Sequence, residues 1–282
     1  MFFRIVSAFL LGLMVQSIFA QNPEPTGVLR NSFRINTLYV GHDLFDGIIK
    51  ADEFRLNVGG VFPLGKYGGG EFFLRESDLN YSVGGLPWDE DHESSEQALS
   101  FFLRDYDRGL LGLGYTRGNR ERSFDYPELG LVGSWKDDYT HLFVQMEYFL
   151  DIYTILLRKG RFDVDYASDT FIGSGYKNDY FTLGARWYLS NTTRVSLLIG
   201  GGDASDYRRV HYLAVPNSLE RKWGFVAGFD HLDDRERIFL GVTYFFNGKP
   251  TVLDRDRRYD GIFSVWDSDL DTFEQLPAIE PI

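Results

Sequence analysis

Apolar and polar residues alternate along this chain in many segments of roughly ten residues. The clearest segment is 140–150, in which Leu142 and Val144 share one face and Gln145 lies on the other. A repeat of two residues separates these faces in a β-strand, whereas a helix would mix them. Segment 140–150 therefore predicts a strand with one continuous apolar face.

Twelve segments carry this alternation, some of them weakly: 31–41, 53–63, 70–80, 97–104, 109–117, 127–136, 140–150, 180–190, 193–202, 208–215, 222–232 and 237–246. Short intervals such as 137–139 follow the even-numbered segments, and longer intervals follow most of the odd-numbered ones. The longest interval, 151–178, is rich in apolar residues. We expect it to fold, either inward as a constriction or as an extracellular hairpin around Lys159 and Gly160.

The pattern favours strands that cross a membrane. After residue 20 no apolar run is long enough for a spanning helix, which needs about 20 residues. A membrane strand needs only about 9–11 residues with every second one apolar. The predicted fold class is all-β, a transmembrane antiparallel up-and-down β-barrel of about 12 strands, within a range of about 10–14. A soluble sandwich, which would use the same residues as core, is the alternative.

Aromatic residues on the apolar faces gather near the segment ends, as expected for belts at the two membrane surfaces. The predicted belt at the short-interval, periplasmic end contains Phe62, Trp135, Trp187, Trp223 and Phe246. The predicted outer belt contains Tyr39, Tyr115 and Tyr148. A sandwich has no reason to collect tryptophan at one end, so the belts favour the barrel.

Composition agrees with β-structure and removes several classes of site. Aromatic residues make up 17% of the chain, and there are 30 glycines. The chain has no cysteine, which excludes disulfides, cysteine-bound zinc, iron–sulfur clusters, thiol nucleophiles and a lipoprotein anchor. The net charge of −12 opposes binding to nucleic acid. We expect no nucleic-acid partner, no cofactor and no metal.

The first twenty residues have the features of a signal peptide. Arg4 is followed by an apolar core at 5–14, and cleavage is expected after Ala20. The core is short for a spanning helix, although an uncleaved anchor is the alternative reading. The predicted organisation is a signal peptide at 1–20, an N-terminal periplasmic segment at 21–30, a barrel at 31–246 and an acidic, periplasmic C-terminal tail at 247–282.

The chain resembles the Gram-negative outer-membrane β-barrel proteins of the porin-like kind. The resemblance rests on the signal segment, on 180–190 followed by 193–202, and on 237–246, which ends Val242-Thr243-Tyr244-Phe245-Phe246. That ending looks like the last strand that barrel assembly machinery reads, although here residues 247–282 follow it. The resemblance implies location in the bacterial outer membrane. It also implies contact with outer-membrane lipid, lipopolysaccharide and the barrel assembly machinery.

Charge divides by strand face in a way that bears on function. The predicted lumen-lining residues are Arg34, Arg55, Arg75, Arg104, Lys136, Glu147, Arg186, Arg194 and Arg209. Apart from Glu147, the only acidic residues assigned inward are Glu128 and Asp230, and acidic residues gather instead in a predicted loop at 89–96. A basic lumen would favour anions. The predicted function is a porin-like channel for small, unidentified solutes with a preference for anions.

Two alternatives use the same residues. Arginines can bridge carboxylates across strands, which would give a closed structural barrel that presents its loops to a partner. A barrel hydrolase would need a catalytic constellation. His141 and His211 are assigned inward, so they form no lipid-facing pair with a serine. The acidic cluster beside His231 is explained as a solvated turn, and we predict no catalytic residue.

Overall fold

The computed structural model describes residues 31–44, 49–83, 89–126, 131–168, 175–202, 206–232, 235–246 and 250–259. Its strands are β1 (Ser32–Leu44), β2 (Ile49–Leu64), β3 (Gly68–Val83), β4 (Asp89–Asp105), β5 (Gly109–Tyr126), β6 (Leu131–Leu150), β7 (Tyr153–Ser168), β8 (Tyr176–Ser190), β9 (Thr193–Gly202), β10 (Asp206–Ala214), β11 (Trp223–Leu232) and β12 (Arg235–Phe245). Three short helical segments complete it: η1 (Asn217–Leu219), α2 (Val252–Asp254) and η2 (Arg255–Tyr259). None of the helices in these ranges is long and apolar enough to cross a membrane.

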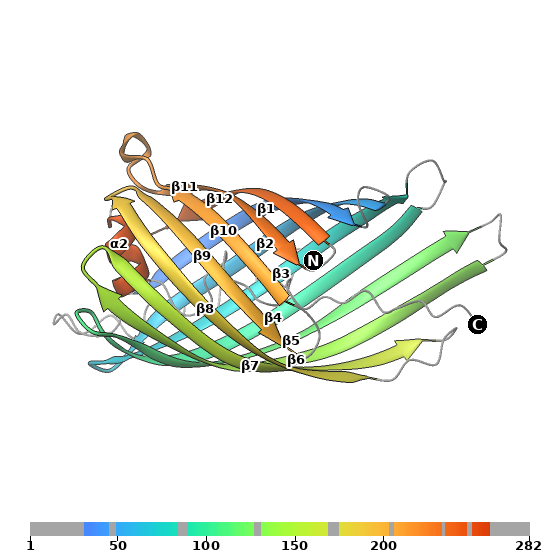
Figure 1. The fold of residues 1–282 in the computed structure, drawn as a ribbon, viewed down its shortest axis with the longest axis horizontal. Coiled ribbons are helices and arrows are strands. Elements are labelled where there is room, and N and C mark those ends of the chain that lie inside the picture. The colour runs from blue at the N-terminus through green and yellow to red at the C-terminus, as the bar shows by residue number, and fades with distance from the viewer. Residues whose placement is uncertain are drawn as a thin grey trace.

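Each strand pairs antiparallel with its neighbours in sequence, and β12 pairs with β1 to close the barrel. The closing register runs from Arg34 opposite Phe245 to Leu44 opposite Arg235. Closure leaves no open sheet edge, which is the condition for strands in a lipid bilayer. The predicted antiparallel barrel of about 12 strands is therefore confirmed (Figure 1).

The connections at one end of the barrel, the short-turn end, all lie within the described ranges. They follow β2, β4, β6, β8 and β10, and the first and last strands begin and end at the same place. The short helices α2 and η2 follow β12, and α2 lies among these turns (Figure 1). The signal peptide, segment 21–30 and Glu128 lie outside the described residues, as do 260–282 of the predicted tail.

The barrel wall has unequal height. Strand β6 has 20 residues and β5 has 18, whereas β9 has 10 and β10 has 9. The outward side chains of β6 are apolar from Leu142 to Leu150 and polar from Thr140 back to Lys136. The apolar part matches the length of one membrane crossing. The polar part extends the tall side of the wall beyond it.

Three sequence expectations are wrong because strands on the tall side of the wall continue beyond the membrane-spanning part. Segments 127–136 and 140–150 do not form two strands, because residues 131–150 form the single strand β6. Most of interval 151–178 is strand β7 in the barrel wall, with Gly160 paired with Phe143 in mid-strand, so this strand is neither an inward constriction nor a hairpin around Lys159 and Gly160. The predicted acidic loop 89–96 is the first half of β4. Where a strand extends beyond the bilayer, both of its faces are polar, so its sequence there resembles that of a turn.

The single β6 strand also corrects two belt assignments. Tyr148 lies near the short β6–β7 turn, and Trp135 lies near the opposite end of the strand. The two residues therefore exchange ends relative to the expectation. Phe62, Trp187, Trp223 and Phe246 lie at the short-turn end, and Tyr39 and Tyr115 lie farther along their strands.

The inward side chains pack into apolar clusters between the polar groups. One contains Phe102, Leu110, Phe143 and Phe149, all nearly inaccessible to solvent. Inward glycines give the rings room: a Cβ at Gly114 would stand 2.3 Å from the Phe143 ring, and one at Gly228 would stand 2.0 Å from the Phe239 ring. Ring-on-glycine packing therefore helps to fill the barrel interior.

Candidate functional site

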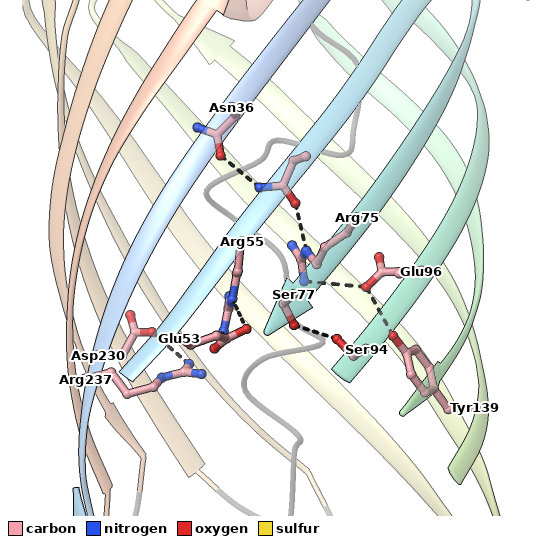
Figure 2. A network of polar contacts seen from close by, with 11 residues as sticks. Asn36, Glu53, Arg55, Arg75, Ser77, Ser94, Glu96, Tyr139, Asp230 and Arg237 are labelled. Carbon is pink, nitrogen blue, oxygen red and sulfur yellow. Dashed lines mark hydrogen bonds and ion pairs between the residues drawn. The ribbon is translucent and has the colours of Figure 1, made fainter. Parts of the chain in front are cut away.

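A hydrogen-bonded chain of inward side chains runs around half of the barrel interior, through Thr243, Asn36, Asn57, Arg75, Glu96 and Tyr139. Figure 2 shows the part of this chain from Asn36 to Tyr139. Asn36 Nδ2 donates to Thr243 Oγ1 at 2.7 Å, and Asn57 Nδ2 donates to Asn36 Oδ1 at 2.8 Å. Arg75 donates to Asn57 Oδ1 at 3.0 Å and to Glu96 Oε2 at 3.5 Å. Because Asn36 and Thr243 belong to β1 and β12, the network also ties the closing seam.

Other inward arginines meet carboxylates from nearby strands. Arg34 lies 2.8 Å from Glu71, and the carboxylate of Asp230 accepts from both Arg209 at 2.7 Å and Arg237 at 2.8 Å. Such buried pairs are favourable only when the charges are well matched and hydrogen-bonded. The interior is therefore organised by ion pairs that span the strands.

A ladder of hydrogen bonds on β6, β7 and β8 connects two arginine side chains to a single carboxylate. Arg158 Nε donates to Gln145 Oε1 at 2.8 Å, and Gln145 Nε2 donates to Glu147 Oε1 at 2.6 Å. Arg186 Nη1 reaches the same Glu147 oxygen at 3.0 Å. Four polar side chains from three strands are thus fixed relative to one another.

The structure places eight of the nine predicted lumen residues in the interior: Arg34, Arg55, Arg75, Arg104, Glu147, Arg186, Arg194 and Arg209. Lys136 is the exception. It is exposed on the outer face of β6, because the strand continues through 137–139 and shifts the alternation by one residue. Its neighbour Asp137 points inward instead, 3.7 Å from Arg120.

Sequence reasoning missed part of the inward set. The missed basic residues are Arg120, Arg158 and Arg237, and the missed acidic ones are Glu53, Glu71, Glu96 and Asp137. Alternation within correctly bounded strands would have found most of them, since Arg120 and Arg158 follow inward Thr116 and Thr154 by even steps. Across the described buried residues, eleven arginines stand against seven carboxylates, an excess of four positive charges.

The arginines of this interior are closely covered. Each of the predicted inward arginines is at most 5% exposed. Arg104 lies over the Phe102 ring at 4.6 Å, and Arg158 lies over the Phe143 ring at 4.7 Å. Rings and guanidinium groups thus share the interior, and the cations are covered rather than displayed in a wide aqueous bore.

Of the three buried histidines among the described residues, His92, His141 and His211, the two that were predicted to face inward both pack against aromatic rings. His141 stacks on Phe162 with ring centroids 4.0 Å apart and shares a 2.7 Å hydrogen bond with Tyr180. His211 meets the Phe239 ring edge-on. Asp230, considered above beside His231, is held between two arginines. Within the described ranges, no group of three or more histidine, aspartate or glutamate side chains could hold a metal ion.

Segment 251–258 closes over the mouth at the short-turn end, and we refer to it as the plug. Thr251 caps its first turn by accepting a hydrogen bond from Asp254 N at 3.0 Å. Val252, 1% exposed, packs into the apolar cluster that includes Val215 and Phe245. Val252 N also donates to Asn191 O at 2.9 Å, in the β8–β9 turn.

Charged side chains extend the plug to other parts of the mouth. Arg255 lies 3.5 Å from the centre of the Phe245 ring and donates to Arg221 O at 2.9 Å. Arg257 donates to Tyr153 O at 2.7 Å. The described part of the predicted C-terminal tail at 247–282 is therefore docked against the barrel at the short-turn end.

Asp256 makes the plug's ion pair with the barrel. One oxygen of this carboxylate, Oδ2, accepts from Arg194 Nη1 at 2.5 Å and from Tyr188 OH at 3.0 Å. All three side chains are buried. Tyr188 OH also lies 3.3 Å from Thr154 Oγ1, so its hydroxyl is held in place by the wall.

Comparison with known proteins agrees with this architecture. No family model matches the chain, and no curated protein does. Among solved structures, the translocator domain of the autotransporter NalP from Neisseria meningitidis has a TM-score of 0.56 at 14% identity, covering 86% of this chain and 96% of its own.

Two further structures align with this chain over nearly the whole of their own length. The beta domain of the Bordetella autotransporter BrkA has a TM-score of 0.53 at 8% identity, covering 76% of this chain and 99% of its own. The KdgM porin in complex with disordered oligogalacturonate has a TM-score of 0.50 at 9% identity, covering 75% and 98%. These neighbours are porins and translocator domains rather than enzymes. The chain has the fold of bacterial outer-membrane β-barrels, and its apolar outer band fits that location.

Proposed function

We propose that this protein is a porin-like outer-membrane channel for small solutes that prefers anions. The observation that carries the proposal is the excess of four arginines over carboxylates among the described buried residues, in a chain whose net charge is −12. Fixed positive charge in a narrow interior lowers the barrier to anions and raises it for cations. The ladder of Arg158, Arg186 and Glu147 is one place where a passing anion would meet two guanidinium groups.

A comparison supports the same direction. The KdgM porin, whose fold is similar, is described in complex with oligogalacturonate, which is an acidic oligosaccharide. In the proposed setting, the apolar band of this barrel contacts outer-membrane lipid and lipopolysaccharide. The aromatic end of β12 is the segment that barrel assembly machinery would read.

A second candidate is a closed structural barrel that presents its far end to a partner. The specific observation in its favour is that the inward arginines are at most 7% exposed and that several of them pair with carboxylates. In that case the arginines stabilise the barrel wall, and no solute passes through the interior.

Planar-bilayer recordings separate the two. We expect stepwise conductance with a reversal potential that reports anion preference in a salt gradient. If no conductance is observed at high protein load, although the protein shows heat-modifiable migration on gels, the closed barrel is favoured.

A pair of variants tests the source of the selectivity. Arg186→Gln removes one inward positive charge and should shift the reversal potential toward cations. The double variant Arg186→Gln with Glu147→Gln removes both members of the 3.0 Å pair and leaves the net interior charge unchanged, so it should return close to wild-type selectivity. Identical selectivity in all three proteins would mean that these side chains do not line the conducting path.

A further inference from the structure

The plug is bound to the barrel through side-chain and backbone contacts, none of which is a strand pairing. None of its residues belongs to a strand, so its release would leave every described strand pair in place. Its contacts include two apolar side chains, the buried Val252 and the partly buried Leu253, and a set of charged or polar hydrogen bonds. A segment with few apolar anchors belongs to the least stable part of a fold.

The receptor for Asp256 has the chemistry of a carboxylate site. Arg194 supplies a guanidinium donor and Tyr188 a hydroxyl donor to the same oxygen, and both side chains are more than nine-tenths buried. Charge-assisted hydrogen bonds of this kind are the strongest that a protein offers to a carboxylate. The ligand in this structure is the chain's own aspartate.

We propose that segment 251–258 is a releasable plug, and that Arg194 and Tyr188 form a carboxylate-binding site at the barrel mouth which Asp256 fills in the closed state. A small carboxylate solute that takes the place of Asp256 at Arg194 releases the plug. The solute part of this proposal rests on the anion preference proposed above. Release of the plug itself does not depend on the barrel being a conducting channel.

The test uses the accessibility of a single cysteine, because the chain has none of its own. Val252→Cys places a thiol at the buried apolar contact of the plug, where a water-soluble maleimide reacts only after release. In this background Asp256→Asn should raise the labelling rate roughly tenfold or more, since it removes one partner of a buried charged hydrogen bond. Tyr188→Phe, which removes one donor and keeps the ring, should give a smaller increase and serves as a second variant.

The matched control is Asp254→Asn in the same background. It removes the same charge two residues away, but the Asp254 contacts are to Thr251 and Arg258 within the plug. Its labelling rate should stay near that of the parent. Heat-modifiable migration of each variant shows that the barrel itself is folded.

The ligand part is tested with sodium succinate against neutral succinamide, at an ionic strength held constant with sodium chloride. Succinate should raise the labelling rate of the Val252→Cys protein to a plateau, and succinamide should not. The proposal is overturned if Asp256→Asn labels no faster than Asp254→Asn, or if succinate has no more effect than succinamide. Bilayer conductance is measured separately. Fast labelling without any conductance would contradict the proposed channel function but would still support a releasable plug.

Discussion

At the scale of single residues, the barrel interior depends on glycines that make room for rings on the adjoining strand. A Cβ at Gly228 would stand 2.0 Å from the Phe239 ring, whereas a Cβ at Gly41 would find its nearest neighbour at 3.9 Å. Gly228→Ala should therefore displace a buried ring and destabilise the barrel by about 1–3 kcal/mol, the usual cost of overpacking. Urea unfolding in lipid vesicles, followed by tryptophan fluorescence, measures the loss.

Gly41→Ala is the matched control, because the added methyl group meets only ordinary contact distances. We expect its unfolding midpoint to stay near that of the wild type. If both alanine variants unfolded alike, ring-on-glycine packing would not be what holds Phe239 in place.

At the scale of strands, alternation was enough to predict which face most residues occupy. It placed Arg34, Arg75 and Arg209 inward, and the structure has them there. It could not reveal where a strand ends once the strand leaves the bilayer, so 137–139 resembled a turn although Asp137 points inward toward Arg120. Ion pairs such as Arg209 with Asp230 require the register between strands, and a period of two does not supply register.

The plug was beyond sequence reasoning for a different physical reason. Segment 251–258 has neither a strand period nor a helix long enough to show one. Its position follows from individual contacts, such as that of Asp256 with Arg194, between residues far apart in the chain. A charged stretch of this composition ordinarily predicts a solvated tail.

The boundary of the apolar band on β6 gives a prediction at this scale. Met146 faces outward between Leu111 and Leu157 on the adjoining strands, whereas Thr140 lies between Arg117 and Asp163. An outward arginine costs about 2–4 kcal/mol at the bilayer midplane and about 0–1 kcal/mol near its surface. Met146→Arg should therefore lower the free energy of unfolding in vesicles far more than Thr140→Arg.

The result also tests the continuity of β6. Equal losses for the two arginine variants would contradict an apolar band that ends near Leu142. A larger loss for Thr140→Arg would place the membrane on the other half of the strand.

At the scale of the whole molecule, the barrel has a tall side and a low side. Strands β3 to β7 have 16 to 20 residues, and β9 to β11 have 9 or 10. All the strands begin or end near the short-turn end, so the difference in length accumulates at the opposite end (Figure 1). The tall side thus carries charged outward residues such as Lys136 beyond the lipid, on the side away from the plug.

This asymmetry predicts how the molecule sits in the outer membrane. Outer-membrane barrels keep their short turns in the periplasm, so the plugged mouth should face inward and the tall wall outward. Lys66 lies exposed in the β2–β3 turn, and Lys136 lies exposed on the tall wall. In whole cells, a membrane-impermeant maleimide should label Lys136→Cys and spare Lys66→Cys until the outer membrane is permeabilised. The two variants carry the same substitution in a chain without other cysteines, so the reverse pattern would mean that the barrel is inserted the other way and that the plug faces the outside of the cell.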